Sequence, residues 1–202
     1  MTEIYIARHG QNEDNANGIL NGHRDLPLTE LDRVQARELG EGMRLAGLQF
    51  DAVYSSPLSR AYETAVIATE IAGLPAPITY SGLIERDFGV MTGQSTSLIE
   101  ELCAPHIVKT DTITYFLNPE GAETFEDLVA RGDTVLKDIQ SRHAGQRVLL
   151  VCHGDIGKMI YAAATGRPWR DVLINFHFGK GDLIETSGEV EAHKIKLTQF
   201  NH

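Results

Sequence analysis

Two β-prone runs in this chain each end on a histidine followed by a glycine, and this pairing constrains the fold more than any other feature. The first run ends in Arg8-His9-Gly10, and the run 147–152 ends in His153-Gly154. Glycine allows the backbone to turn sharply where a strand stops. In α/β sheets, sites form at the carboxyl ends of strands. Whether the two histidines share one site therefore depends on how the rest of the chain is built.

Strand and helix signals alternate along the chain. We expect strands at 3–8, 50–55, 78–80 and 147–152, with late candidates at 173–178, 181–186 and 192–200. Helical signals cover about 30–46, 61–72, 123–143 and 155–165. Strands that alternate with helices predict an α/β fold. We expect a three-layer α/β/α sandwich with a mostly parallel sheet and helices on both faces.

The helix expected at about 30–46 carries two signals. Thr29 fits an N-cap, and Asp32 follows three residues later, close to a capping box. The larger apolar residues are spaced for one helical face, and they are Leu31, Val34, Leu39, Met43 and Leu45.

Two stretches carry few regular signals. Residues 10–27 are polar and rich in glycine and asparagine, and residues 86–122 contain short apolar pieces with no clear period. Long irregular stretches in a compact domain are usually functional. A chain of 202 residues is long enough for one full core. We therefore expect a single domain over 1–202, in which 86–122 is a small cap over the site.

The charge balance excludes some partners. The chain has 18 Lys and Arg against 28 Asp and Glu, a formal net charge of −10. A general nucleic-acid binder needs a basic surface, so we expect no nucleic-acid partner. No apolar run approaches the roughly 18 to 20 residues of a membrane span, and no signal peptide is recognisable, so we expect no membrane partner. The two cysteines, Cys103 and Cys152, suggest a reducing compartment and a cytoplasmic protein.

Three predicted strand ends supply groups that favour anions. Arg8 and His9 follow one strand, Arg60 follows another in Ser56-Pro57-Leu58-Ser59-Arg60, and His153 follows a third. A guanidinium group can donate two parallel hydrogen bonds to two oxygens of a phosphate or carboxylate group. A lone histidine at a strand end could simply cap backbone groups, but this convergence favours a pocket for a doubly charged anion. The histidines lack compact metal-ligand spacing, so we predict no metal.

Two other phosphate motifs are close but do not fit. Cys152 to Lys158 approaches a Cys-x5-Arg phosphatase loop, but position 158 is lysine and the cysteine ends a buried strand. Gly154 to Lys158 is similar to a fragment of a P-loop, but Met159 stands where that loop needs Ser or Thr.

Taken in order, the motifs resemble the histidine phosphatase superfamily, also called phosphoglycerate mutase-like, over most of the chain. Arg-His-Gly alone would be a weak signal, and the ordered set is a strong one. Asn12 departs from the usual threonine, Asp32 from the usual glycine, and Lys158 from the arginine of many relatives. The stretches that carry the resemblance are Arg8 to Asn15, Gly22 to Thr29, Gln35-Ala36, Ser56 to Arg60 with Thr64-Ala65, Glu85 to Gly89, Gly121 to Thr124, and His153-Gly154.

The resemblance implies a phosphoryl transfer in two covalent steps and no cofactor. His9 would attack phosphorus to give a phosphohistidine. Glu85 would protonate the leaving alkoxide and then act as base on the water that clears the intermediate. Arg8, Arg60 and His153 would hold the phosphoryl oxygens and stabilise the transition state. Asn15 would add a neutral donor, and Gly22 and Gly154 would also lie at the phosphate.

The resemblance leaves three functions open. Mutases of the family usually carry a longer insert before the last histidine, so this short chain favours a phosphatase that acts on a small phosphorylated metabolite. The alternatives are a phosphoglycerate mutase that depends on 2,3-bisphosphoglycerate and a module that binds a phosphorylated ligand without catalysis. Residues 86–122 should select the substrate. A homodimer is left open.

Overall fold

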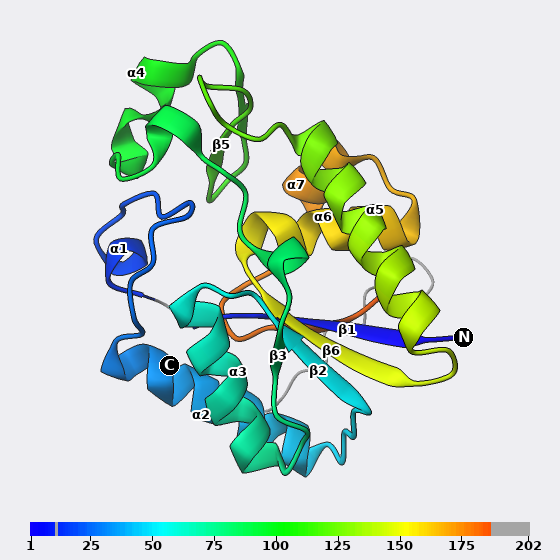
Figure 1. The fold of residues 1–202 in the computed structure, drawn as a ribbon. Helices are drawn as coiled ribbons and strands as arrows, with labels where there is room; N and C mark the ends of the chain where they lie inside the picture. Colours follow the sequence, from blue (N-terminus) through cyan, green and yellow to red (C-terminus); the bar gives the residue numbers. More distant parts are fainter. Residues whose placement is uncertain (11, 187–202) are drawn as a thin grey trace.

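A five-stranded sheet of order β3-β2-β6-β1-β7 forms the centre of the molecule (Figure 1). The structure is a computed structural model, and it describes residues 1–10 and 12–186. The parallel strands are β1 (Glu3–Arg8), β2 (Ala52–Ser55), β3 (Ile78–Thr79) and β6 (Arg147–Cys152). The edge strand β7 (Leu183–Glu185) runs antiparallel to β1. The prediction of an α/β fold with a mostly parallel sheet is confirmed.

The register of β1 and β6 brings the two His-Gly junctions together. Arg8 lies opposite Cys152 at the carboxyl ends of the two neighbouring strands. The backbone N–H of His9 then donates to the carbonyl of Cys152 at 3.0 Å. His9 and His153 therefore leave the sheet at the same edge.

Helices cover both faces of the sheet because successive strand residues point to opposite sides (Figure 1). Ile4 and Ile6 of β1 pack in a core with α5 (Phe125–Arg142), α6 (Gly154–Thr165) and α7 (Trp169–Asn175). Tyr5 and Ala7 of the same strand face α2 (Glu30–Leu45) and α3 (Ser59–Ala72). These two cores make the three layers that the sequence predicts.

The helix α2 begins as predicted, and Leu39 and Met43 of its predicted face are buried. The Thr29 side chain accepts from the N–H of Asp32, and the Asp32 carboxylate accepts from the N–H of Thr29, which completes a capping box. Leu31 and Leu45, by contrast, are 58% and 64% exposed. A Cβ at Gly40 would lie 2.7 Å from a backbone oxygen of α3, so the two helices approach too closely for large side chains there. The buried face of α2 is Asp32, Ala36, Leu39, Gly40, Gly42 and Met43.

The predicted strand at 173–178 is wrong, because α7 occupies its first half, 173–175. Pro168 precedes this helix, and the carboxylate of Asp171 accepts from Arg167 and from Asn175. Polar contacts four residues apart are a helical pattern. The apolar run 172–174 is too short to show a helical period, and its β-prone residues suggested a strand. The other candidate, 181–186, contains β7, and the run 192–200 lies outside the described residues.

Residues 86–122 form a small lobe beside the carboxyl ends of the strands (Figure 1). The lobe has its own apolar cluster of Phe88, Met91, Ile99, Cys103 and Phe116. Short elements explain why the sequence showed no period there. They are the turns η2 (Gly89–Met91) and η3 (Thr96–Leu98), the helix α4 (Ile99–Cys103), and a hairpin of β4 (Ile107–Lys109) and β5 (Thr114–Phe116).

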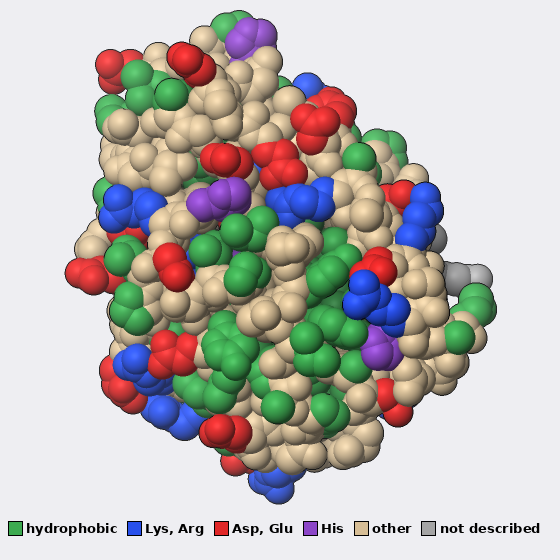
Figure 2. Space-filling view, viewed as in Figure 1, with side chains coloured by type: hydrophobic (Ala, Val, Ile, Leu, Met, Phe, Trp, Pro, Cys, Tyr) green, Lys and Arg blue, Asp and Glu red, His purple; other side chains and the backbone are tan. Residues whose placement is uncertain are grey.

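One face of the molecule carries exposed apolar side chains. Figure 2 shows them gathered over α3 and β3. On these two elements Tyr62 is 40% exposed and Ile78 is 55% exposed. A homodimer stays a prediction.

Within the described part of the chain, no helix has the length and apolar character that crossing a membrane requires.

Candidate active site

A cavity of about 180 Å³ opens at the carboxyl ends of β1 and β6. Five residues that the sequence predicts for the site line it, namely Arg8, His9, Asn15, Glu85 and Gly154. The remaining wall comes from Asp155 and Lys158 of α6, from Phe88, Thr96, Ile113 and Tyr115 of the lobe, and from residues 18–21. The fold therefore assembles segments from distant parts of the chain around one small space.

His9 is buried in a form suited to nucleophilic attack. His9 is only 4% exposed, and its Nδ1 contacts the carbonyl oxygen of Gly10. This contact selects the tautomer in which Nδ1 carries the proton and Nε2 carries the lone pair. Burial, and then the charges of Arg60 and Arg8, lower the pKa of His9 well below its usual value. The imidazole is therefore neutral at pH 7, as attack on phosphorus requires.

His153 lies directly against His9. The two rings meet edge to face with their centroids 4.9 Å apart. Nε2 of His153 is 2.7 Å from the hydroxyl of Ser56, while Nδ1 is buried with no hydrogen-bond partner among the described residues. Burial and the charge of Arg60 lower the pKa of His153 as well. The two histidines thus belong to one site.

Two arginines bring positive charge to the site, and backbone carbonyls hold both of them. Arg8 Nη1 donates to the carbonyl of Phe178 at 2.7 Å. Arg60 Nη1 donates to the carbonyl of Arg24 at 2.6 Å, and its Nη2 donates to that of Gly22 at 2.9 Å. In the part of the chain that the structure describes, the buried Nε atoms of Arg8 and Arg60 have no hydrogen-bond partner. A guanidinium held by neutral carbonyls keeps its charge for an anion.

The two glycines predicted for the site, Gly22 and Gly154, act in different ways. Gly154 leaves room for a neighbouring side chain, and Gly22 acts through its backbone carbonyl. A Cβ at Gly154 would lie 3.2 Å from the guanidinium carbon of Arg8, so glycine leaves room for that side chain. The carbonyl of Gly22 orients Arg60, and the neighbouring Asn21 lines the cavity.

The loop 10–27 is more regular than its composition suggests. It contains the short helix α1 (Glu13–Ala16), and Asn12 caps it by accepting from the N–H of Asn15 at 3.0 Å. Asn12 and Asn21 also exchange two side-chain hydrogen bonds, of 2.9 and 3.0 Å. Asparagine at position 12 therefore keeps the capping role and adds a link that presents Asn15 and Asn21 to the cavity.

Glu85 meets the N-terminus of α6. Its carboxylate accepts from the N–H groups of Arg86 at 2.9 Å, Ile156 at 3.1 Å and Asp155 at 3.4 Å. Burial, and then the negative charge of Asp155, raise the pKa of Glu85 above its usual value, whereas the hydrogen bonds from Arg86 and Ile156 act against this. A carboxyl group with a raised pKa keeps its proton to higher pH, which suits a general acid.

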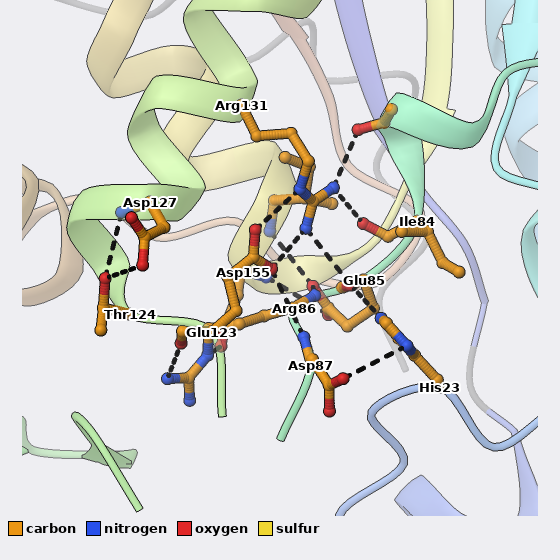
Figure 3. A network of polar contacts seen from close by, with 12 residues as sticks. His23, Ile84, Glu85, Arg86, Asp87, Glu123, Thr124, Asp127, Arg131 and Asp155 are labelled. Carbon is orange, nitrogen blue, oxygen red and sulfur yellow. Dashed lines mark hydrogen bonds and ion pairs between the residues drawn. The ribbon is translucent and has the colours of Figure 1, made fainter. Parts of the chain in front are cut away.

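The backbone of Glu85 is held from two further sides (Figure 3). His23 Nε2 lies 2.7 Å from the carbonyl oxygen of Glu85. Arg131 of α5 donates to the carbonyl of Ile84 at 2.7 Å and pairs with Glu123 at 2.7 Å. Sequence reasoning missed His23 and Arg131, because they act on backbone carbonyls and leave no motif.

Arg86 connects the lobe of residues 86–122 to the helices α5 and α6 that pack on the sheet. It is 1% exposed, and its Nε donates to Asp155 of α6 at 2.9 Å. Its guanidinium lies against the rings of Phe88, Phe116 and Phe125, at 5.1, 4.3 and 4.3 Å from their centroids. The position next to Glu85 gave no signal of this role.

A comparison with protein families decides the identity. A model described as the histidine phosphatase superfamily (branch 1) matches residues 4–199. The chain belongs to the histidine phosphatase superfamily. This confirms the resemblance seen in the motifs. Among the described residues, no three His, Cys, Asp or Glu side chains come together as a metal site, and the absence of a metal stays a prediction.

Members of the superfamily with different names are similar to this chain. A 2,3-bisphosphoglycerate-dependent phosphoglycerate mutase of Rhizobium etli is 33% identical over 162 residues, which cover 77% of this chain and 76% of the mutase. The structure of a mycobacterial glucosyl-3-phosphoglycerate phosphatase with VO3 is 25% identical, with a TM-score of 0.75 and coverage of 91% and 90%. The structure of Bacillus stearothermophilus YhfR is 29% identical, with a TM-score of 0.75 and coverage of 96% and 95%.

Proposed function

We propose that this member of the superfamily is a phosphomonoesterase, which hydrolyses a small phosphorylated metabolite through a phosphohistidine at His9. One observation carries the proposal: His9 and Glu85 line the same cavity with pKa values displaced in opposite directions. These shifts favour a deprotonated nucleophile and a protonated acid, which is how environments assign acid and base roles.

The first step transfers the phosphoryl group to the protein. Nε2 of His9 attacks phosphorus, and the ester P–O bond breaks. Glu85 gives its proton to the leaving oxygen. Arg8 and Arg60 supply positive charge to the equatorial oxygens of phosphorus as their negative charge spreads.

The second step releases phosphate. The Glu85 carboxylate takes a proton from water, and the water oxygen attacks phosphorus as the N–P bond breaks. Inorganic phosphate leaves, His9 regains its neutral form, and Glu85 is protonated again. Each turnover therefore consumes one water and restores both residues.

A phosphoglycerate mutase primed by 2,3-bisphosphoglycerate is the second candidate. The name of the R. etli relative favours it. The short segment 86–122 favours the phosphatase, because mutases of the family usually carry a longer insert there. Hydrolysis and mutase activity are therefore measured together, with and without the primer.

The decisive test combines trapping with the leaving group. We expect acid-labile phosphate on the wild type and none on His9→Ala, which should lose about 10³-fold or more in kcat. Glu85→Gln should slow alkyl phosphates, which have poor leaving groups, about 10²-fold more than 4-nitrophenyl phosphate. Equal slowing of both ester classes would contradict the acid role. Binding of phosphate without turnover of any ester would favour a non-catalytic module.

A further inference from the structure

Lys158 is a buried cation in the wall of the cavity. It stands one helical turn after Gly154 on α6, is 5% exposed, and lines the same space as His9. Nζ donates to the phenolic oxygen of Tyr115 at 2.8 Å. In the described part of the chain no carboxylate forms an ion pair with it, and the nearby Asp155 is held by Arg86 at 2.9 Å.

This arrangement leaves Lys158 without an ion-pair partner among the described residues. An ammonium group has three N–H donors, and Tyr115 takes one of them. Charged groups are almost never buried unless an opposite charge accompanies them. Burial and the nearby charge of Arg8 lower the pKa of Lys158 to about 8, although Asp155 acts in the other direction. The group is therefore still mostly protonated at pH 7.

We propose that Lys158, together with the hydroxyl of Tyr115, binds a carboxylate on the alcohol portion of the substrate, so that the protein selects phosphorylated carboxylic acids. This inference rests on the proposed function and deepens it. The charges of the two groups are equal and opposite, because one protonated lysine balances one carboxylate. A second phosphate would bring up to two negative charges beside Glu85 and Asp155, which line the same cavity.

The geometry limits the length of such a substrate. Gly154 and Lys158 are four residues apart, which is about 6 Å along the axis of α6, and helical side chains lean toward the N-terminus. Phosphate and carboxylate groups are then separated by only a few bonds. The apolar side chains of Ile19, Leu20, Phe88 and Ile113 line the remaining wall and suit a short carbon chain.

The test compares matched pairs of esters. The phosphate esters of 2-hydroxyethanoic, 3-hydroxypropanoic and 4-hydroxybutanoic acid are each compared with the monophosphate of the diol of equal length. We expect the wild type to favour at least one acid by about tenfold or more in kcat/KM, the usual gain from a charge-assisted contact. Lys158→Met should reduce this acid-to-diol ratio about tenfold, Tyr115→Phe should reduce it less, and Lys158→Arg should retain most of it.

The pH dependence of the same ratio is a second readout. Lys158 faces Tyr115 from β5, Arg8 from β1 and Asp155 from its own helix. Because the lysine loses its proton above about pH 8, the ratio should fall there in the wild type and persist in Lys158→Arg. Titration of the phosphate and of His9 affects both esters and cancels in the ratio. Lys109→Met, which removes an exposed lysine of the lobe, should leave the ratio unchanged.

Two results would overturn the inference. One is an acid-to-diol ratio that does not change in Lys158→Met while circular dichroism shows a folded protein. The other is a preference for diol bisphosphates over the acids. If the wild type hydrolyses no ester, the proposed function fails by itself, and calorimetry on His9→Ala, with and without Lys158→Met, still decides whether the acid esters bind more tightly through this lysine.

Discussion

His9 and His153 are buried against each other, and neither residue can easily accept a proton. Burial and the charges of Arg60 and Arg8 oppose a further positive charge, so the pKa of each imidazole is lowered. The same burial raises the pKa of Glu85, because a carboxyl group is charged when it loses its proton. One desolvated space therefore favours the neutral form of the histidines and the protonated form of the carboxyl group.

The lowered histidine pKa values predict that the fold loses stability in mild acid. In the unfolded chain a histidine titrates near 6.5, whereas His9 and His153 titrate well below that in the folded state. Below about pH 6.5 the unfolded state therefore binds more protons, and the free energy of unfolding falls as the pH falls. Each histidine contributes at most about 1.4 kcal/mol per pH unit.

Urea denaturation between pH 7.5 and 5.5 measures this slope. The double variant His9→Gln/His153→Gln should show a shallower slope than the wild type. His106→Gln removes an exposed histidine and should leave the slope as it is. An unchanged slope in the double variant would show that the two imidazoles are not the source.

Some residues of this site could be predicted from the sequence, and others could not. The presence of His9 and Arg60 at this site could be predicted, because their motifs follow predicted strands. The environment of Glu85 could not be predicted, because its partner Ile156 lies 71 positions away in the chain. The link between Asn12 and Asn21 was equally hidden, since it depends on the path of a loop.

Among the elements, α6 sets the position of more than one group at the site. It begins directly after His153, its first N–H groups meet Glu85, and Gly157 in its second turn faces Phe178. A Cβ at Gly157 would lie 2.2 Å from the Phe178 ring. The carbonyl of Phe178 in turn accepts from Arg8. Glycine at position 157 thus helps to position Arg8 through Phe178, without contacting the arginine itself.

Gly157→Ala should disturb the site from outside it. We expect a loss of about 1–3 kcal/mol in the free energy of unfolding, the usual cost of overpacking, together with a fall in kcat/KM. Because the clash is with the Phe178 ring, adding Phe178→Leu should recover part of both losses. Chemical denaturation and steady-state kinetics measure the two effects. A double variant no better than Gly157→Ala alone would contradict this account.

The elements that the sequence predicted correctly are those with a strong local pattern. The buried strands β1 and β6 and the capped helix α2 are of this kind. The failures come from neighbours in space. Gly40 packs against α3, so the face of α2 that is buried is the one with small residues. Val172 and Leu173 of the apolar run 172–174 pack into the core from α7, while Ile174 is 52% exposed, a helical pattern that so short a run could not reveal.

At the scale of the whole molecule, a chain of net charge −10 gathers several cations at one site. The charge of Arg8 acts on both Arg60 and Lys158. Arg86 is different, because it is paired with Asp155 and lies between the lobe and α6. That the segment 86–122 acts as a cap stays a prediction, and Arg86 is the residue through which it can be tested.

Arg86→Met should weaken the attachment of the lobe as well as the fold. The change leaves Asp155 without its cation, and breaking a buried ion pair on one side costs about 3–5 kcal/mol. Asp155 is 14% exposed in its side chain, so we expect the lower end of that range. Proteolysis of residues 104–114 should become faster, because Arg86 no longer pairs with Asp155 and the lobe loses this link to α6. The double variant Arg86→Met/Asp155→Asn removes both charges and should regain part of the stability in urea denaturation. If it were as unstable as Arg86→Met, the packing of the guanidinium against the phenylalanine rings, and not the ion pair, would hold the lobe in place.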